Sequence, residues 1–256
     1  MGVTKMFYGI SEENVEKFNE SLNSIINIYE GNVFAADMLI AIAKNLSFWY
    51  DEKFSKSFKA TAQTDQEKSL AWRLHVLTWA ASHVLHLEGD FVECGVLRGF
   101  SSAVICKYLD FENIPKNFYL YDTFSGLPEE TSTEEERAGH SVYKTNYNSE
   151  ELFAYVQNIF SIYPNVRIVK GIVPYSFTEA VPEKISYFHI DMNSAQAEIL
   201  ALEHLFDKVV PGGMIILDDF GWSGYRGQTL AEIKFMQDRG YKILELPTGQ
   251  GLVLKR

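Results

Sequence analysis

The chain has 256 residues, 46% hydrophobic and 14% aromatic, so it can form one large α/β domain or a core domain with an appendage, and is not a disordered chain. Its formal net charge of −11, with no basic stripe, argues against a nucleic-acid-binding protein. No run approaches the roughly 18 apolar residues of a membrane span. The start lacks a secretory leader and the two cysteines form no CxxC pair, so we expect a reduced, cytoplasmic protein that binds neither nucleic acid nor a membrane.

Residues 1–88 are predicted to form a helical N-terminal extension, because apolar residues recur there at helical spacing and strand alternation is absent. Within it, residues 69–87 are apolar nearly all round, which indicates a buried helix. His75, His83 and His86 lie near one face of that helix and could bind a metal ion, although packing beside its tryptophans is the favoured interpretation. We expect the apolar helices either to pack on their own domain or to form the interface of a homo-oligomer.

Residues 89–256 are predicted to form a second domain, in which short apolar runs alternate with helical segments. This alternation predicts a mostly parallel sheet that is covered by helices on both faces. The last two runs are separated only by residues 247–250, too few for a parallel crossover, so they should pair as an antiparallel hairpin at one edge. The expected strands are residues 90–95, 117–122, 166–171, 185–191, 214–219, 241–246 and 251–256.

One segment, residues 123–149, interrupts this alternation and shows little periodicity. Loops of this length inside compact domains are usually lids or binding loops, or else they are disordered. We expect this segment to be a lid over the functional site.

Polar residues collect at the carboxyl ends of the predicted strands, where open parallel sheets bind their ligands. Glu93 lies near the end of the first strand, Asp122 ends the second and Asp191 ends the fourth. The fifth ends in two adjacent carboxylates, Asp218 and Asp219, which must be compensated either by water at a turn or by a cation. Because these ends meet at one edge of the sheet, the pattern predicts a ligand site there.

The turn after the first strand carries Gly95 and Gly99, which would let a ligand approach the backbone beside the N–H groups of the following helix. Asp122 occupies the position from which an acidic side chain binds the ribose hydroxyls of a nucleoside cofactor. Taken singly, the alternatives are an ordinary strand–helix turn and a turn-capping Asp. Together the two features favour a nucleoside cofactor, and the absence of GxGxxG weighs against a nicotinamide-dependent oxidoreductase.

Four motifs, GDFVECGVLRGFSS, YLYDTFSGLP, FHIDMN and PGGMIILDDFG, resemble in order and spacing the macrocin O-methyltransferase family. Its members are class I S-adenosylmethionine-dependent enzymes that methylate hydroxyls on sugars and other small molecules. The resemblance covers residues 87–256. It implies a Rossmann-like α/β fold, with a seven-stranded, mostly parallel sheet whose last strand is antiparallel. It also implies a homo-oligomer that acts on a small-molecule acceptor such as a sugar, a glycosylated metabolite or a diol.

The resemblance further implies which residues hold the cofactor and a metal ion. The methionine part of S-adenosylmethionine would lie at the turn after the first strand, and its ribose at Asp122. A divalent cation, usually Mg²⁺, would bind Asp191, Asp218 and Asp219, an all-oxygen set that suits a hard cation. The implied cofactor-binding residues are Glu93, Gly95, Val96, Gly99, Ser101, Ser102, Asp122, Thr123, Phe124, Gly171 and Asp191.

The chain departs from the family's usual Asp-x-Asp pattern, because Asn193 replaces the second Asp, a candidate general base. Asn cannot accept a proton, although it can orient a substrate or a metal-bound water. His140 in the expected lid is a candidate base, with an ordinary loop histidine as the alternative, and His189 inside a strand is interpreted as structural. The catalytic candidates are therefore Asp191, Asn193 and His140. The alternative function is a catalytically silent S-adenosylmethionine- or nucleoside-binding protein that lacks the usual base.

Overall fold

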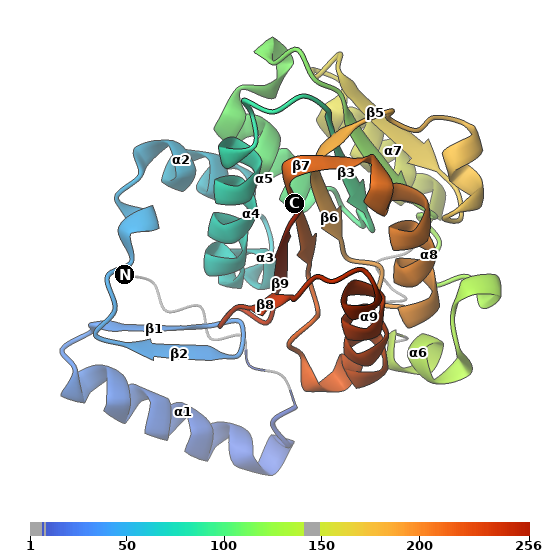
Figure 1. The fold of residues 1–256 in the computed structure, drawn as a ribbon. Coiled ribbons are helices and arrows are strands. Elements are labelled where there is room, and N and C mark those ends of the chain that lie inside the picture. Colours follow the sequence, from blue (N-terminus) through green and yellow to red (C-terminus); the bar gives the residue numbers. More distant parts are fainter. Residues whose placement is uncertain (1–6, 8, 141–148) are drawn as a thin grey trace. The chain divides into compact units, whose positions relative to one another are not determined.

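The computed structural model describes residue 7 and residues 9–140 and 149–256 (Figure 1). Residues 141–148, which belong to the expected lid, lie outside the described residues. Within the described part of the chain, no helix combines the length and the apolar composition needed to cross a membrane.

The internal contacts divide the chain into two compact units, Met1–His75 and Val76–Arg256. The division falls inside helix α4 (Ala71–His83), before the domain boundary expected after residue 88. Helix α4 therefore contributes residues to both units, and each unit is described by itself.

The first unit contains a β-hairpin that the sequence analysis did not predict, so the expectation of helices without strands is wrong for residues 33–42. Its turn residues, Asp37 and Met38, both have positive φ, as in the two-residue turns whose twist matches that of paired strands. Both strands consist of four apolar residues and lack the polar–apolar alternation that signals a strand. The elements are α1 (Glu12–Ile28), β1 (Val33–Ala36), β2 (Leu39–Ile42), η1 (Ser47–Trp49), α2 (Glu52–Thr61), α3 (Asp65–Ser69) and the start of α4.

The three histidines of the predicted buried helix pack against aromatic rings. His75 stacks on Phe48 with 5.0 Å between ring centroids, and His83 stacks on Trp79 at 5.1 Å and meets His86 edge-on. Among the residues that the structure describes, the side-chain groups able to hold a metal ion do not include these histidines. The packing interpretation is therefore supported over the metal-binding one.

The second unit is built on a seven-stranded sheet with the strand order β5-β4-β3-β6-β7-β9-β8. The first five strands in this order pair in parallel, and β9 lies antiparallel to both of its neighbours. The predicted sheet and its antiparallel C-terminal hairpin are confirmed. The strands are β3 (Asp90–Cys94), β4 (Phe118–Asp122), β5 (Val166–Lys170), β6 (Ile185–Ile190), β7 (Val209–Leu217), β8 (Leu244–Glu245) and β9 (Gly251–Leu254).

Helices α8 and α9 lie side by side and share one buried apolar cluster with the sheet (Figure 1). From β3 the sheet grows to one side through β4 and β5 and to the other side through β6 and β7. The order thus reverses between β3 and β6, and such switch points form the ligand crevice of open α/β sheets. The remaining elements of this unit are α5 (Phe100–Leu109), η2 (Phe111–Asn113), η3 (Glu129–Thr131), α6 (Glu134–Gly139), α7 (Ser149–Phe160), η5 (Tyr175–Thr178), α8 (Ala195–Leu205), η6 (Phe206–Lys208), η7 (Ser223–Tyr225) and α9 (Arg226–Asp238).

Candidate active site

The turn between β3 and α5 packs closely against its neighbours at both of its glycines. Gly95 has a φ of +90°, and a Cβ atom built on it would lie 1.7 Å from the carbonyl oxygen of Asp191 at the end of β6. Gly99, the N-cap residue of α5, has a φ of +73°, and its Cβ would lie 2.8 Å from Cε2 of Phe160. Gly95 is therefore required by a backbone contact and Gly99 by its positive φ, in both cases independently of any ligand.

Asp122, the last residue of β4, ties the end of that strand to the β3–α5 turn. Its Oδ2 accepts hydrogen bonds from the N–H groups of Val96 at 2.7 Å and Leu97 at 2.8 Å, and its Oδ1 accepts one from the N–H of Phe124 at 2.6 Å. These are turn-capping contacts, the alternative that the sequence left open for this residue. They also hold the Asp122 carboxylate beside the predicted cofactor turn, and its ribose-binding role stays a prediction.

The other predicted cofactor residues surround the same strand ends. Ser101 is half-buried in the first turn of α5, and the Thr123 hydroxyl closes its own turn by donating to a backbone carbonyl at 2.8 Å. The N–H of Gly171 donates to the carbonyl of the last β4 residue at 2.9 Å, which brings the end of β5 alongside. The Phe124 ring is fully buried against a phenylalanine of α7, with 5.1 Å between ring centroids.

The predicted metal ligands Asp191, Asp218 and Asp219 meet where β6 and β7 end. Each offers a carboxylate oxygen, and these oxygens all lie within 4.8 Å of one another. Oxygen ligands about 2.1 Å from Mg²⁺ are about 3 Å apart when adjacent and about 4.2 Å apart when opposite, so small movements suffice to hold such an ion. Asp218 and Asp219 are buried and Asp191 is half-buried, so crowded negative charge requires compensation. Asn193 lies beside the group and donates from Nδ2 to Asp191 Oδ1 at 3.2 Å.

A buried chain of polar side chains connects this metal group to the β3–α5 turn. His189 on β6 is the register partner of Glu93 on β3, with 2.8 Å between His189 Nδ1 and Glu93 Oε1. Its other nitrogen, Nε2, lies 3.2 Å from Asp218 Oδ1, which also accepts a hydrogen bond from Gln250 Nε2 at 2.8 Å. Ser102 Oγ donates to the second oxygen of Glu93. His189 and Gln250 are not among the predicted site residues, because strand register cannot be read from sequence.

The charge of His189 follows from its two partners. Burial lowers the pKa of His189, but the hydrogen bonds and charges of Asp218 and Glu93 outweigh burial and raise it to about 10. Both ring nitrogens face carboxylate oxygens, which only accept, so both donate and the ring is an imidazolium. Glu93 and Asp218 are 2% and 3% exposed, and the imidazolium supplies the positive charge that their burial requires.

The described part of the expected lid, residues 123–140, is folded and attached to the start of α8. It contains η3 and α6, and Thr133 caps α6 in a reciprocal capping box with Glu136. Glu136 Oε1 also accepts a hydrogen bond from the N–H of Ala195 at 2.9 Å, and Ser194 Oγ donates to a carbonyl of η3. This segment therefore contacts the chain directly after the end of β6.

His140, the candidate base, follows α6 as its C-cap residue and is half-buried. Burial lowers the pKa of His140, and the charge of Asp122 acts in the opposite direction. The charge that affects His140 is therefore that of the predicted ribose-binding residue, Asp122. A lowered pKa keeps the imidazole neutral near pH 7, and the neutral form can accept a proton.

Two carboxyl groups that the sequence analysis missed, Glu198 of α8 and Glu232 of α9, face each other in the interior. Glu198 Oε1 accepts a hydrogen bond from the N–H of Met192 at 3.0 Å and so supports the backbone next to Asp191. Both glutamates are fully buried. Among the described residues, Glu198 Oε2 and the two carboxylate oxygens of Glu232 have no partner other than each other. Two adjacent carboxyl groups can satisfy each other by sharing a proton. Burial raises the pKa of Glu198 well above its ordinary value and that of Glu232 to about 7.

This pair predicts a pH-dependent stability. The pKa of Glu232 is about 7 in the folded protein, against an ordinary value of 4.5. Its contribution to stability is therefore fully present below its unfolded pKa. That contribution is lost as the pH rises through about 7. We expect the free energy of unfolding to decrease between about pH 5 and about pH 8. In Glu232→Gln this decrease should be smaller by up to about 3 kcal/mol. Urea unfolding across this range measures it. Glu203→Gln, at an exposed position of α8, should follow the wild type. An unchanged fall in Glu232→Gln would contradict the prediction.

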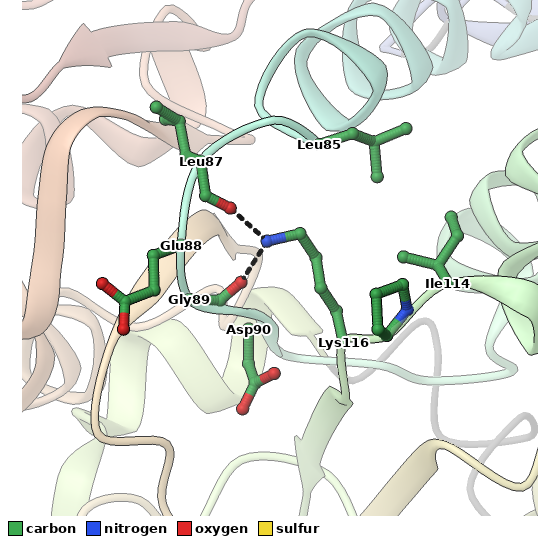
Figure 2. A pocket seen from close by; sticks show the side chains of 8 residues that line it. Leu85, Leu87, Glu88, Gly89, Asp90, Ile114 and Lys116 are labelled. Carbon is green, nitrogen blue, oxygen red and sulfur yellow. Dashed lines mark hydrogen bonds between the residues drawn. The ribbon is translucent and has the colours of Figure 1, made fainter.

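A separate pocket of about 450 Å³ lies at the opposite end of the sheet, where β3 begins (Figure 2). Lys116 extends toward the carbonyl groups of Leu87 and Gly89 and donates to both, the latter at 2.6 Å (Figure 2). Burial lowers the pKa of Lys116, against the opposing charges of Asp90 and Glu88. Because open α/β sheets bind ligands at the carboxyl ends of their strands, we do not assign this pocket to the active site.

Comparison with known proteins identifies the family. The profile of the macrocin-O-methyltransferase (TylF) family matches residues 57–241, more than half of the chain. A curated relative is the 8-demethyl-8-(2,3-dimethoxy-alpha-L-rhamnosyl)-tetracenomycin-C 4'-O-methyltransferase of Streptomyces olivaceus. It is 25% identical over 157 residues, which are 58% of this chain and 60% of that protein. The chain thus spans less than two thirds of the length of the curated relative it matches.

Solved structures share the fold. The O-methyltransferase NovP gives a TM-score of 0.60 at 20% identity, covering 77% of this chain and 83% of that one. CalS11, described as a TDP-rhamnose 3'-O-methyltransferase of calicheamicin biosynthesis, gives a TM-score of 0.53 at 16% identity, covering 97% and 96%. These likenesses confirm the fold class, and the profile match confirms the resemblance carried by the four motifs. The chain belongs to the macrocin O-methyltransferase (TylF) family.

Proposed function

We propose that this protein is an S-adenosylmethionine-dependent O-methyltransferase that methylates a hydroxyl of a sugar, a glycosylated small molecule or a related diol. The observation that carries the proposal is the group formed by Asp191, Asp218 and Asp219, with oxygens within 4.8 Å of one another, beside the β3–α5 turn. In a chain of this family, an oxygen-only cation site next to a nucleoside-type turn supports methyl transfer to a coordinated hydroxyl. The rhamnosyl group in the name of the curated relative supports a sugar-bearing acceptor.

The residues present fit both groups that the proposal needs. S-Adenosylmethionine, when bound, supplies a methyl group on a positively charged sulfur. The β3–α5 turn would hold its methionine part, and Asp122 would hold its ribose. Asp191, Asp218 and Asp219 would hold Mg²⁺ or another divalent cation, which supplies a Lewis acid for an acceptor hydroxyl.

The protein's own part is to position the acceptor and to receive its proton. Asn193 donates to Asp191 at 3.2 Å and can orient an acceptor, but its amide cannot take a proton. Glu198 holds the backbone between these two residues by accepting from the N–H of Met192 at 3.0 Å. His140 is the candidate base, because its lowered pKa keeps it neutral and able to accept a proton.

Asn193 favours a second candidate, a silent protein that binds S-adenosylmethionine or a related nucleoside without turnover. This alternative lacks a base at the position where the family usually has an Asp. It predicts binding of the cofactor without its consumption by any acceptor. We expect a homo-oligomer under both candidate functions, and sedimentation velocity measures the oligomeric state.

The test is a calorimetric titration of S-adenosylmethionine into metal-stripped protein, repeated with Mg²⁺, followed by mass spectrometry of rhamnosides and nucleotide-linked deoxysugars incubated with both. Binding that tightens with Mg²⁺, together with a methylated acceptor, supports the proposal. Binding that is indifferent to Mg²⁺ returns the adjacent aspartates to a turn-capping role. Binding without turnover over the whole acceptor panel supports the silent protein, and no binding contradicts both.

A further inference from the structure

We propose that His189 is a positioning residue that couples cofactor binding to metal binding, through Glu93 on one side and Asp218 on the other. The inference rests on the proposed function, because it takes the β3–α5 turn as the cofactor site and the three aspartates as the metal site. It goes beyond that function by assigning to one buried side chain the communication between the two sites.

The contacts that link the two sites are continuous. The chain runs from Ser102 in the first turn of α5 to Glu93, then to His189 at 2.8 Å and on to Asp218 at 3.2 Å. Its four members are between 0% and 3% exposed. Water therefore does not compete for these hydrogen bonds, and each side chain has one arrangement that satisfies its neighbours.

Two buried donors orient the Asp218 carboxylate. Hydrogen bonds from His189 Nε2 and Gln250 Nε2 arrive on the same carboxylate oxygen, Oδ1, which fixes the rotation of the carboxylate. Partners behind a metal-binding carboxylate set its direction and its basicity, and their loss commonly weakens metal binding about 10- to 100-fold. His189 is thus placed to decide how Asp218 meets a cation.

At its other end, the hydrogen-bonded chain reaches the predicted cofactor turn. Glu93 lies on β3 directly before the predicted cofactor turn, and Ser102 lies in the helix directly after it, so the two residues bracket the turn. A ligand that orders the turn also orders Glu93. The rigid imidazole of His189 then transmits the position of Glu93 to Asp218, as a contiguous hydrogen-bonded network can.

Two substitutions break different links of the chain. His189→Asn keeps a donor near the place of Nδ1, facing Glu93, and loses the link to Asp218. His189→Gln keeps a donor near the place of Nε2, facing Asp218, and loses the link to Glu93. His204→Gln is the matched control, because His204 is an exposed histidine of α8 that bonds a carbonyl of its own helix. Circular dichroism and thermal unfolding check that each variant is folded.

The measurement is the dissociation constant of Mg²⁺ by calorimetry, with and without saturating S-adenosylhomocysteine. The ratio of the two constants is the coupling factor. We expect a factor of at least about 5 in the wild type and in His204→Gln, and a factor near 1 in both His189 variants. Without S-adenosylhomocysteine, Mg²⁺ affinity should fall about 10- to 100-fold in His189→Asn, and much less in His189→Gln.

Two results would overturn the inference while leaving the proposed function standing. The first is that the wild-type protein binds both ligands but with a coupling factor near 1. The second is that both His189 variants keep the coupling factor of the wild-type protein. A wild type that binds neither ligand overturns the proposed function and the inference together. Should the His189 variants fail to fold, Ser102→Ala breaks the chain at its far end without touching β6. It should lower the coupling factor, and a wild-type factor in Ser102→Ala would overturn the inference.

Discussion

Replacing Asp191 with Asn is expected to lower kcat/KM for methyl transfer by about 100- to 1,000-fold. Asn has the same size and keeps an oxygen for the hydrogen bond from Asn193, but it removes one negative charge from a group whose oxygens lie within 4.8 Å of one another. A cation that is bound more weakly provides less Lewis acidity, which costs several kcal/mol of transition-state stabilisation. Each factor of ten in rate corresponds to about 1.4 kcal/mol. Steady-state kinetics over a range of Mg²⁺ concentrations measures the effect.

The control for this variant is Asp207→Asn, whose side chain is 95% exposed. It should keep wild-type kinetics, because a solvated carboxylate on η6 contributes little beyond its own surroundings. The deficit of Asp191→Asn should shrink as Mg²⁺ is raised. Wild-type kcat/KM in Asp191→Asn, or wild-type turnover that survives thorough chelation, would remove the cation from the mechanism.

Replacing Gly95 with Ala is expected to lower the free energy of unfolding by more than about 3 kcal/mol, or to prevent folding. The added Cβ would lie 1.7 Å from the carbonyl oxygen of Asp191 and 2.4 Å from its carbonyl carbon. These are backbone atoms at the end of β6, so relief requires movement of a strand rather than a change of rotamer. The φ of +90° adds strain for any residue with a Cβ. Urea unfolding followed by circular dichroism measures the loss.

Gly126→Ala separates the two causes of this loss. Gly126 has a nearly equal φ of +88°, but a Cβ built on it meets no atom within 4 Å. It should therefore lose only the conformational part, about 1–2 kcal/mol. Equal losses in the two variants would show that the contact between the β3–α5 turn and Asp191 contributes nothing.

The sequence by itself determined the sheet and the edge at which the candidate site lies. The runs that end at Asp122, Asp191 and Asp218 are apolar over a strand's length and alternate with helical periodicity, which permits parallel crossovers. The short link of residues 247–250 permits only an antiparallel hairpin, and β8 and β9 pair in that way. These signals are local, since each depends on the burial of residues along one element.

Only the tertiary structure shows which buried polar groups contact each other and why Gly95 is required. Glu93 and His189 are 96 residues apart in sequence and His189 and Asp218 are 29 apart, and their contacts depend on strand register. Gly95 is required by a carbonyl of another strand, a reason that its own turn does not reveal. The hairpin of residues 33–42 likewise could not be predicted from the sequence, because its short apolar strands show no alternation. Local sequence specifies the apolar faces that are buried, but which side chains touch depends on the packing of the whole sheet.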